Sequence, residues 1–318
     1  MRRLVLSISV SGLFLLGAIP AHASPPSPSN PAGHILGVVP AHGHASSQRS
    51  GGSNLTYHNG PVEIGVHHTF AIYWNPSNVY SYSTSYQSII NGFFQNVAGG
   101  SGSTSNVYDS DTQYYNSART HISYSESFGG AISDSSAAGN GCSSRAGGSL
   151  CVNDGQIQQE VQRVVKNSNL PVGTTDEYFV FLPNGVSSCY GGSSCAFSQF
   201  CAYHSNTSAG NGTTSGTVLY ANMPYTGHNL SACGSGNSPN GDAAADSTIN
   251  VTSHEANESI TDPLGTAWYD RSGYENGDKC AWNFGSYSGN YNQTIDGGHY
   301  FLQQEWSNHS SGCVLQRT

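Results

Sequence analysis

The stretch that decides the expected fold is residues 247–263, STINVTSHEANESITDP. Val251 and Ile260 are apolar residues that flank a polar centre. Pro263 ends the segment, because proline cannot continue a helix and disfavours helical backbone in the residue before it. We therefore predict a helix over residues 247–261, with the pattern His-Glu-x-x-Glu at residues 254–258.

The polar residues of this helix have the spacing of metal ligands. A helix turns about 100° per residue, so His254, Glu258 and Asp262 lie along one stripe of its surface. Imidazole and carboxylate are both zinc ligands, and a catalytic zinc takes three protein ligands plus water. The sequence therefore predicts metal ligands at these three positions. Glu255 is the predicted general base beside a metal-bound water, and peptide-bond hydrolysis is the expected reaction.

The pattern differs from His-Glu-x-x-His because Glu258 replaces the second histidine. A carboxylate makes the site more anionic, so zinc is the first expectation and calcium the alternative. The third ligand stays open, because the turn into Pro263 can direct Asp262 elsewhere. The other candidate ligands are Asp270, Glu275, Asp278 and His299. A buried His–Glu pair that only forms a hydrogen bond is the structural alternative.

An acidic loop follows the helix and contains Asp270, Glu275 and Asp278. We expect it either to hold a second ion or to close over a substrate. A hydrogen-bonded turn held by Cys280 is the structural alternative. The spacing of these acids does not match an EF-hand loop.

Residues 1–23 have the three parts of a secretory signal peptide. Arg2 and Arg3 precede an apolar run over residues 4–19, and the sequence AHA at residues 21–23 predicts cleavage after Ala23. That run is short for a membrane anchor, and no other segment approaches about 20 apolar residues. We therefore expect a secreted, extracellular protein without membrane contact after cleavage.

Residues 24–53 are rich in proline, serine, glycine and histidine and have no apolar period, which predicts a flexible leader. The histidines of this leader, His34, His42 and His44, are weak metal candidates. Residues 54–318 have the length of a single domain and show no internal repeat.

All eight cysteines lie in the exported part, where an even count favours disulfides over a zinc cluster. None stands in a CxxC arrangement. Eight cysteines allow about 105 connectivities, but pairing between near neighbours is the simplest. The predicted bridges are Cys142–Cys151, Cys189–Cys195, Cys201–Cys233 and Cys280–Cys313.

The remaining patterns indicate an α+β fold. We expect strands over residues 62–74, 177–182 and 218–223, and a helix over residues 86–97. A second helix starts at Asp154, which is the expected cap, and carries Ile157, Val161, Val164 and Val165 on one face. Strands and helices mix without strict alternation. With the late metal-type helix, this order predicts a single zincin-like domain with a mixed sheet and a turn-rich, disulfide-stapled C-terminal part.

Composition limits the choice of partners. The net charge is −9 with only 10 lysines and arginines, so nucleic acid is a poor partner. No GxSxG elbow or P-loop is present. A wall-polysaccharide hydrolase or binder is a second alternative. A carboxylate pair such as Glu255 and Glu258 could serve a hydrolase, and the 19 tyrosines and 4 tryptophans could line a groove for a polysaccharide. We expect a monomer that acts on a polypeptide or another extracellular polymer.

Several motifs resemble the phosphate-induced protein 1 (EXORDIUM-like) family, in the order of that family. They are LTYHNGPV at residues 55–62, Tyr73-Trp74, PNGD at residues 239–242, TDPLG at residues 261–265, and Tyr300-Phe301-Leu302 with Trp306 before Cys313. The likeness spans most of the mature chain.

Plant members of this family are exported to the cell-wall space and linked to growth responses. The resemblance therefore implies export, and it adds a non-catalytic binding or signalling protein as the alternative to a hydrolase. Bacterial secreted relatives read Ser-His-Glu where this chain has residues 253–255, whereas plant sequences lack the His-Glu pair.

Overall fold

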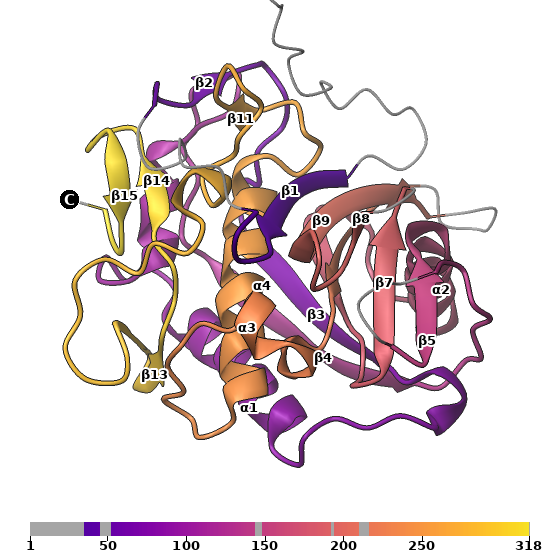
Figure 1. Ribbon diagram of the computed structural model, residues 1–318. Coiled ribbons are helices and arrows are strands. Elements are labelled where there is room, and N and C mark those ends of the chain that lie inside the picture. Colours follow the sequence, from indigo (N-terminus) through magenta and orange to yellow (C-terminus); the bar gives the residue numbers. More distant parts are fainter. Residues whose placement is uncertain (1–34, 45–51, 144–147, 192–193, 210–215, 318) are drawn as a thin grey trace, which may run out of the picture.

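The computed structural model describes residues 35–44, 52–143, 148–191, 194–209 and 216–317. At its centre is a six-stranded mixed sheet with the order β1-β9-β10-β6-β3-β4 (Figure 1). These strands are β1 (Ile35–Pro40), β3 (His67–Trp74), β4 (Glu126–Asp134), β6 (Gly173–Phe181), β9 (Phe200–Ser208) and β10 (Thr217–Met223). Strands β4, β3, β6 and β10 run parallel, whereas β9 is antiparallel to both of its neighbours. The predicted α+β class is confirmed.

The long helices are α1 (Tyr86–Gly99), α2 (Asp154–Asn167) and α4 (Ala243–Thr261), and they cover both faces of this sheet (Figure 1). Successive residues of a strand point to opposite faces. Phe179 of β6 packs on Phe94 of α1, whereas the hydroxyl of Tyr178 donates to the carbonyl of Pro171, just after α2. Helix α4 lies beside α1. Helices α1 and α4 therefore share one face, and α2 covers the other.

The start of α2 differs from the prediction. Asn153 is the cap: its side chain accepts from the Gln156 N–H, and the Gln156 side chain accepts from the Asn153 N–H. Asp154, the expected cap, is the first helical residue. Its Oδ1 accepts the hydroxyls of Tyr203 and Tyr220, which ties α2 to β9 and β10. The predicted apolar face of α2 is buried.

The other predicted elements are present with shifted ends. Helix α1 starts at Tyr86 as predicted and buries its apolar face. Strand β3 begins only at His67, because Gly65 has φ of 105°, outside the extended region. Helix α4 begins before Ser247, because the Asp242 side chain accepts the N–H groups of Ala244 and Ala245 and caps the helix there.

Short elements complete the domain. Strand β2 (Thr56–Tyr57) pairs with β11 (Trp268–Tyr269), β12 (Gln293–Ile295) with β13 (Gly298–Tyr300), and β14 (Glu305–Ser307) with β15 (Gly312–Val314). A three-stranded sheet holds β5 (Leu150–Asn153), β7 (Val186–Tyr190) and β8 (Ser194–Cys195). The short helices are η1 (Pro76–Asn78), η2 (Val107–Gln113), η3 (Thr226–His228), α3 (Leu230–Cys233) and η4 (Asp278–Cys280).

The four predicted disulfides are all present. Of these, Cys280–Cys313 joins the segment after the predicted acidic loop to strand β15. Within the described residues, no helix combines the length and the apolar composition of a membrane span.

Part of the expected flexible leader is an ordered strand. Residues 35–40 form β1 at the edge of the sheet, with Gly37, Val39 and Pro40 buried. The predicted signal peptide and residues 24–34 and 45–51 of the leader lie outside the described residues. Composition averaged over residues 24–53 hid this short strand, whose partner β9 is remote in sequence.

A cluster of ionisable side chains is buried between the sheet and α4. His67 Nδ1 lies 2.8 Å from Glu126 Oε2, and His67 Nε2 lies 3.5 Å from carboxylate oxygens of Glu63 and Glu177. Burial opposes protonation of His67, but Glu126 and Glu63 outweigh it and hold its pKa well above the usual value. Burial also raises the pKa values of Glu63 and Glu177. The core of the fold therefore contains a group of ionisable side chains that interact with one another.

Candidate metal centre

Helix α4 brings His254 and Glu258 together, as predicted. They lie about one helical turn apart, and His254 Nε2 is 3.0 Å from Glu258 Oε1. Both residues are fully buried at 0% exposure. They belong to the part of the molecule where α4 runs beside β1 and β9 (Figure 1).

A second imidazole, that of His204, approaches Glu258 from strand β9. His204 Nε2 is 3.6 Å from Glu258 Oε2 and 2.9 Å from Glu275 Oε2. The alternation of the strand explains its direction: the preceding Tyr203 faces α2, so His204 faces α4. The sequence prediction missed His204, because one histidine within a strand carries no spacing signal.

Two groups of side chains in the described part of the chain bring carboxylate and imidazole atoms within 4.8 Å of one another. The first is His254, Glu258 and Asp278, and the second is His204, Glu258 and Glu275. Glu258 belongs to both groups. Zinc–ligand distances are about 2.0 to 2.2 Å, so ligand atoms at this separation can surround one small cation.

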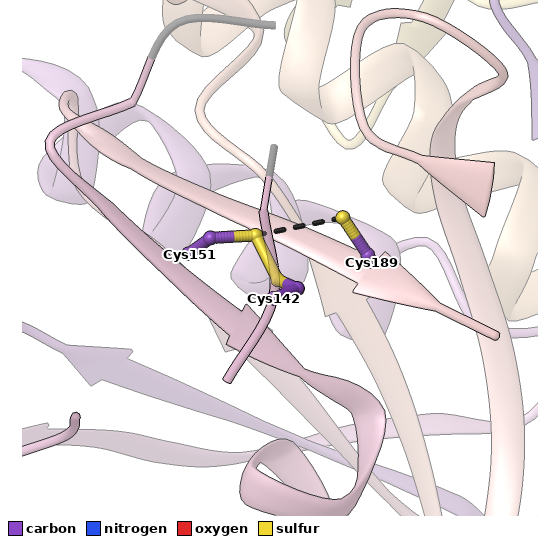
Figure 2. Close-up of side chains that lie close together, drawn as sticks. All are labelled: Cys142, Cys151 and Cys189. Carbon is purple, nitrogen blue, oxygen red and sulfur yellow. Dashed lines mark hydrogen bonds between the residues drawn. A yellow bond between two sulfur atoms is a disulfide. The ribbon is translucent and has the colours of Figure 1, made fainter. Parts of the chain in front are cut away.

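A third converging group, Cys142, Cys151 and Cys189, is not a metal site. Figure 2 shows the disulfide between Cys142 and Cys151, with Cys189 Sγ 3.5 Å from Cys151 Sγ. Cys189 is itself bonded to Cys195. Because metals bind the thiolate, these oxidised sulfurs are not ligands.

The acids of the loop after α4 have two different roles. Asp270 Oδ1 accepts the N–H groups of Ser272 and Tyr274, and its Oδ2 lies 3.0 Å from Lys279 Nζ. Asp270 is therefore structural. Glu275 and Asp278 instead reach the ligand groups, and the Asp278 N–H donates to Glu258 Oε1 at 2.7 Å.

Gly277 lets this loop lie against the histidine. A Cβ at this position would come within 2.9 Å of the His254 ring, closer than side chains normally approach. A glycine at residue 277 thus places the neighbouring Asp278 within reach of the pair on α4.

Asp262, the predicted third ligand, ends helix α4 instead. Its Oδ1 accepts the N–H groups of Thr266 and Ala267 at 2.6 and 2.7 Å, and Asp262 is in neither ligand group. Burial raises the pKa of Asp262 to about 6, although these backbone hydrogen bonds oppose the shift. The other reserve ligand, His299, is exposed and stacks on Tyr291 at a ring distance of 3.9 Å. Asp278, rather than Asp262, is the third member of the group with His254 and Glu258.

Glu255, the predicted general base, lies beside the ligand pair. Its Oε1 accepts the Val39 N–H at 3.4 Å, and its Oε2 has no hydrogen-bond partner within the described part of the chain. Burial raises the pKa of Glu255 well above the usual value, and the carboxylates of Glu258 and Asp278 raise it further. A carboxyl group with a raised pKa is suited to proton transfer near neutral pH.

The site collects more acidic groups than cations. Burial, together with the charge of His254, lowers the pKa of His204 to about 3, so His204 is neutral at pH 7. Burial also raises the pKa of Glu275. Among the described residues, the nearby Lys279 forms its ion pair with Asp270, away from the ligand groups. Buried carboxylates require protons or a cation as compensation.

Gln303 determines which ring nitrogen of His254 carries the proton. The Trp282 N–H donates to Gln303 Oε1, which turns Gln303 Nε2 toward His254 Nδ1 at 3.0 Å. With Nδ1 as the acceptor, this network places the ring proton of neutral His254 on Nε2, facing Glu258. A cation at Nε2 must displace that proton, because metals bind neutral imidazole through a free lone pair.

Comparison with protein-family models, with curated proteins and with solved structures gives no match. The EXORDIUM-like resemblance therefore remains a prediction from the motifs. Two of those motifs have clear structural roles at α4: Asp242 of PNGD caps the start of the helix, and Asp262 of TDPLG shapes the turn at its end.

Proposed function

We propose that this chain is a divalent-cation-dependent hydrolase that acts on polypeptides, with zinc as the cation. The observation that supports it is the position of Glu258 between two imidazoles, with Glu275 and Asp278 from the following loop. Imidazole and carboxylate oxygen form the donor set of catalytic zinc sites. His254, Glu258 and Asp278 would hold the ion.

Such an ion would supply a bound water whose pKa falls toward about 7. Glu255 would accept a proton from the attacking water and deliver it to the leaving nitrogen. Among the described residues, its Oε2 has no hydrogen-bond partner, so this oxygen is available for the role. His204, neutral and held by Glu275, completes the polar wall on the sheet side.

We further infer a zincin-like arrangement in a secreted protein. A late helix with the ligand pair and the base lies beside the antiparallel edge of a mixed sheet. The disulfides agree with export, since such bridges persist in oxidising compartments.

A second candidate is a non-catalytic secreted module in which the same residues hold a structural ion. The observation that favours it is burial: His254, Glu255 and Glu258 are all 0% exposed. Structural metal sites are closed, whereas catalytic sites keep an open position.

The two candidates differ in the effect of Glu255→Gln. For the hydrolase, we expect chelator-sensitive casein hydrolysis that falls about 10²- to 10⁴-fold in this variant, while its zinc content is unchanged. Glu160→Gln, which changes a buried carboxylate on α2, is the control and should retain activity. Long incubations make slow turnover visible. A zinc-loaded chain without chelator-sensitive hydrolysis would contradict the hydrolase and favour the structural module.

A further inference from the structure

Strand β1 lies across the candidate metal centre. Two consecutive N–H groups of this strand point to site carboxylates: that of Val38 lies 3.4 Å from Asp278 Oδ1, and that of Val39 lies 3.4 Å from Glu255 Oε1. These carboxylates are the proposed third ligand and the proposed base. The strand therefore occupies the side of the site that a substrate would have to reach.

The closest approach is at Gly37. A Cβ at this position would overlap Glu258 Oε2 and would lie 2.7 Å from Glu275 Oε2. Only a residue without a side chain lets the backbone pass this close to the carboxylates. The β1 backbone thus touches the shared ligand Glu258 itself.

The pairing of β1 with β9 is irregular where the strand crosses the site. The register runs from Ile35 opposite Ser205 to Val38 opposite Tyr203, with a shift between the two pairs. Gly37 lies within this shift, alongside His204. A bulge of this kind leaves residues outside the regular ladder and bends the strand. Irregular pairing therefore coincides with the contact to the acidic centre.

The end of β1 is fastened by a few separate contacts. The Pro40 carbonyl accepts the Trp282 Nε1–H at 2.8 Å, and the Ala41 N–H donates to the Gln199 carbonyl at 3.0 Å. Removal of β1 would expose the outer edge of β9 next to His204. Such an edge binds extended peptides through backbone hydrogen bonds.

We propose that the outer edge of β9 is a binding site for an extended polypeptide with a small residue facing Glu258, and that residues 35–40 occupy it as an internal pseudosubstrate. The intact chain then turns over slowly, because β1 must leave before a substrate binds, and this latency accounts for the burial of a catalytic arrangement. The latency rests on the proposed hydrolase, whereas peptide binding at the edge does not. Because β1 is tethered, it competes at an effective concentration on the order of millimolar.

The test uses the full chain with Gly37→Ala, which introduces the overlapping Cβ. Gly139→Ala is the matched control, because a Cβ there meets nothing within 4 Å and the backbone needs no positive φ. The probe is a labelled peptide of residues 35–40, ILGVVP, with binding followed by fluorescence anisotropy. We expect Gly37→Ala to bind this peptide at least about 10-fold more tightly than wild type or the control.

A second variant keeps the proposal testable if Gly37→Ala does not fold. Trp282→Phe removes the hydrogen bond to Pro40 and keeps a ring in place. It should also increase peptide binding and speed hydrogen exchange of the Val38 and Val39 amides. Equal peptide binding by wild type, control and both variants would overturn the proposal.

Casein hydrolysis distinguishes the pseudosubstrate role of β1 from the proposed hydrolase activity. Faster chelator-sensitive hydrolysis by Gly37→Ala than by Gly139→Ala supports the latency. Peptide binding by Gly37→Ala without any hydrolysis would support the edge site and contradict the hydrolase. Hydrolysis at equal rates in wild type and Gly37→Ala, without peptide binding, would contradict the pseudosubstrate alone.

Discussion

The buried cluster around His67 gives a prediction whose size follows from its geometry. His67→Gln keeps much of the side-chain volume but removes the cation that lies 2.8 Å from Glu126 and 3.5 Å from Glu63 and Glu177. Removal of one partner from a buried ion pair costs about 3 to 5 kcal/mol, because a charge remains buried without compensation. For a chain of this size, about 1 kcal/mol corresponds to 2 to 4 °C in Tm. The expected drop at pH 7 is therefore about 6 to 20 °C.

The pH dependence identifies the cause. The folded-state pKa of His67 is raised, so its contribution is present below about pH 6.5 and is lost as the pH rises through the raised value. The raised pKa values of Glu63 and Glu177 act in the same direction. The stability difference between wild type and His67→Gln should therefore be largest below about pH 6.5. It should shrink as the pH rises through the raised pKa of His67.

The assay is thermal unfolding by circular dichroism at several pH values. The neighbouring His68 is the matched control, because its side chain is 41% exposed and its pair with Asp176 is partly solvated. His68→Gln should cost less than about 1 kcal/mol. Equal losses of Tm in His67→Gln and His68→Gln, or a loss in His67→Gln that does not change with pH, would refute the reasoning.

Three further predictions concern the metal centre. Asp278→Asn should weaken zinc binding at least about 10-fold by isothermal titration calorimetry. Asp262→Asn should leave the zinc affinity unchanged and cost about 1 to 3 kcal/mol of stability. A loss of zinc affinity in Asp262→Asn but not in Asp278→Asn would restore Asp262 as the ligand. Zinc affinity should fall as the pH falls, because a cation at His254 Nε2 must displace the ring proton that faces Glu258. Titrations in buffers of different ionisation enthalpy should show proton release, and no release would contradict a proton on His254 Nε2. Gln303→Glu should tighten zinc binding about 10-fold, because a carboxylate favours the His254 tautomer with Nδ1–H; weaker binding would contradict the assigned tautomer.

Local patterns in the sequence predicted the centre of this structure. The spacing of His254 and Glu258 placed them on one helical stripe, and the pair meets as expected. Sequence proximity also predicted all four disulfides. These predictions succeeded because each depends on contacts within one helix or between cysteines that follow one another in the sequence.

The rest depends on contacts between distant segments. His204 reaches Glu258 only because β9 packs beside α4 and the alternation of the strand turns this residue toward the helix. Asp278, rather than Asp262, becomes the third member of the group because of the turn after α4 and the close approach at Gly277. Sequence spacing alone contains neither piece of geometry.

The most direct test of the central claim is the metal content of the purified full chain, measured by elemental mass spectrometry after incubation with zinc and removal of unbound ions. We predict about one zinc ion per chain in wild type and in Glu160→Gln, and a loss of that ion in Glu258→Gln, which changes the residue shared by both ligand groups. A wild-type chain without bound metal, or a Glu258→Gln variant that keeps its full content, would contradict the account.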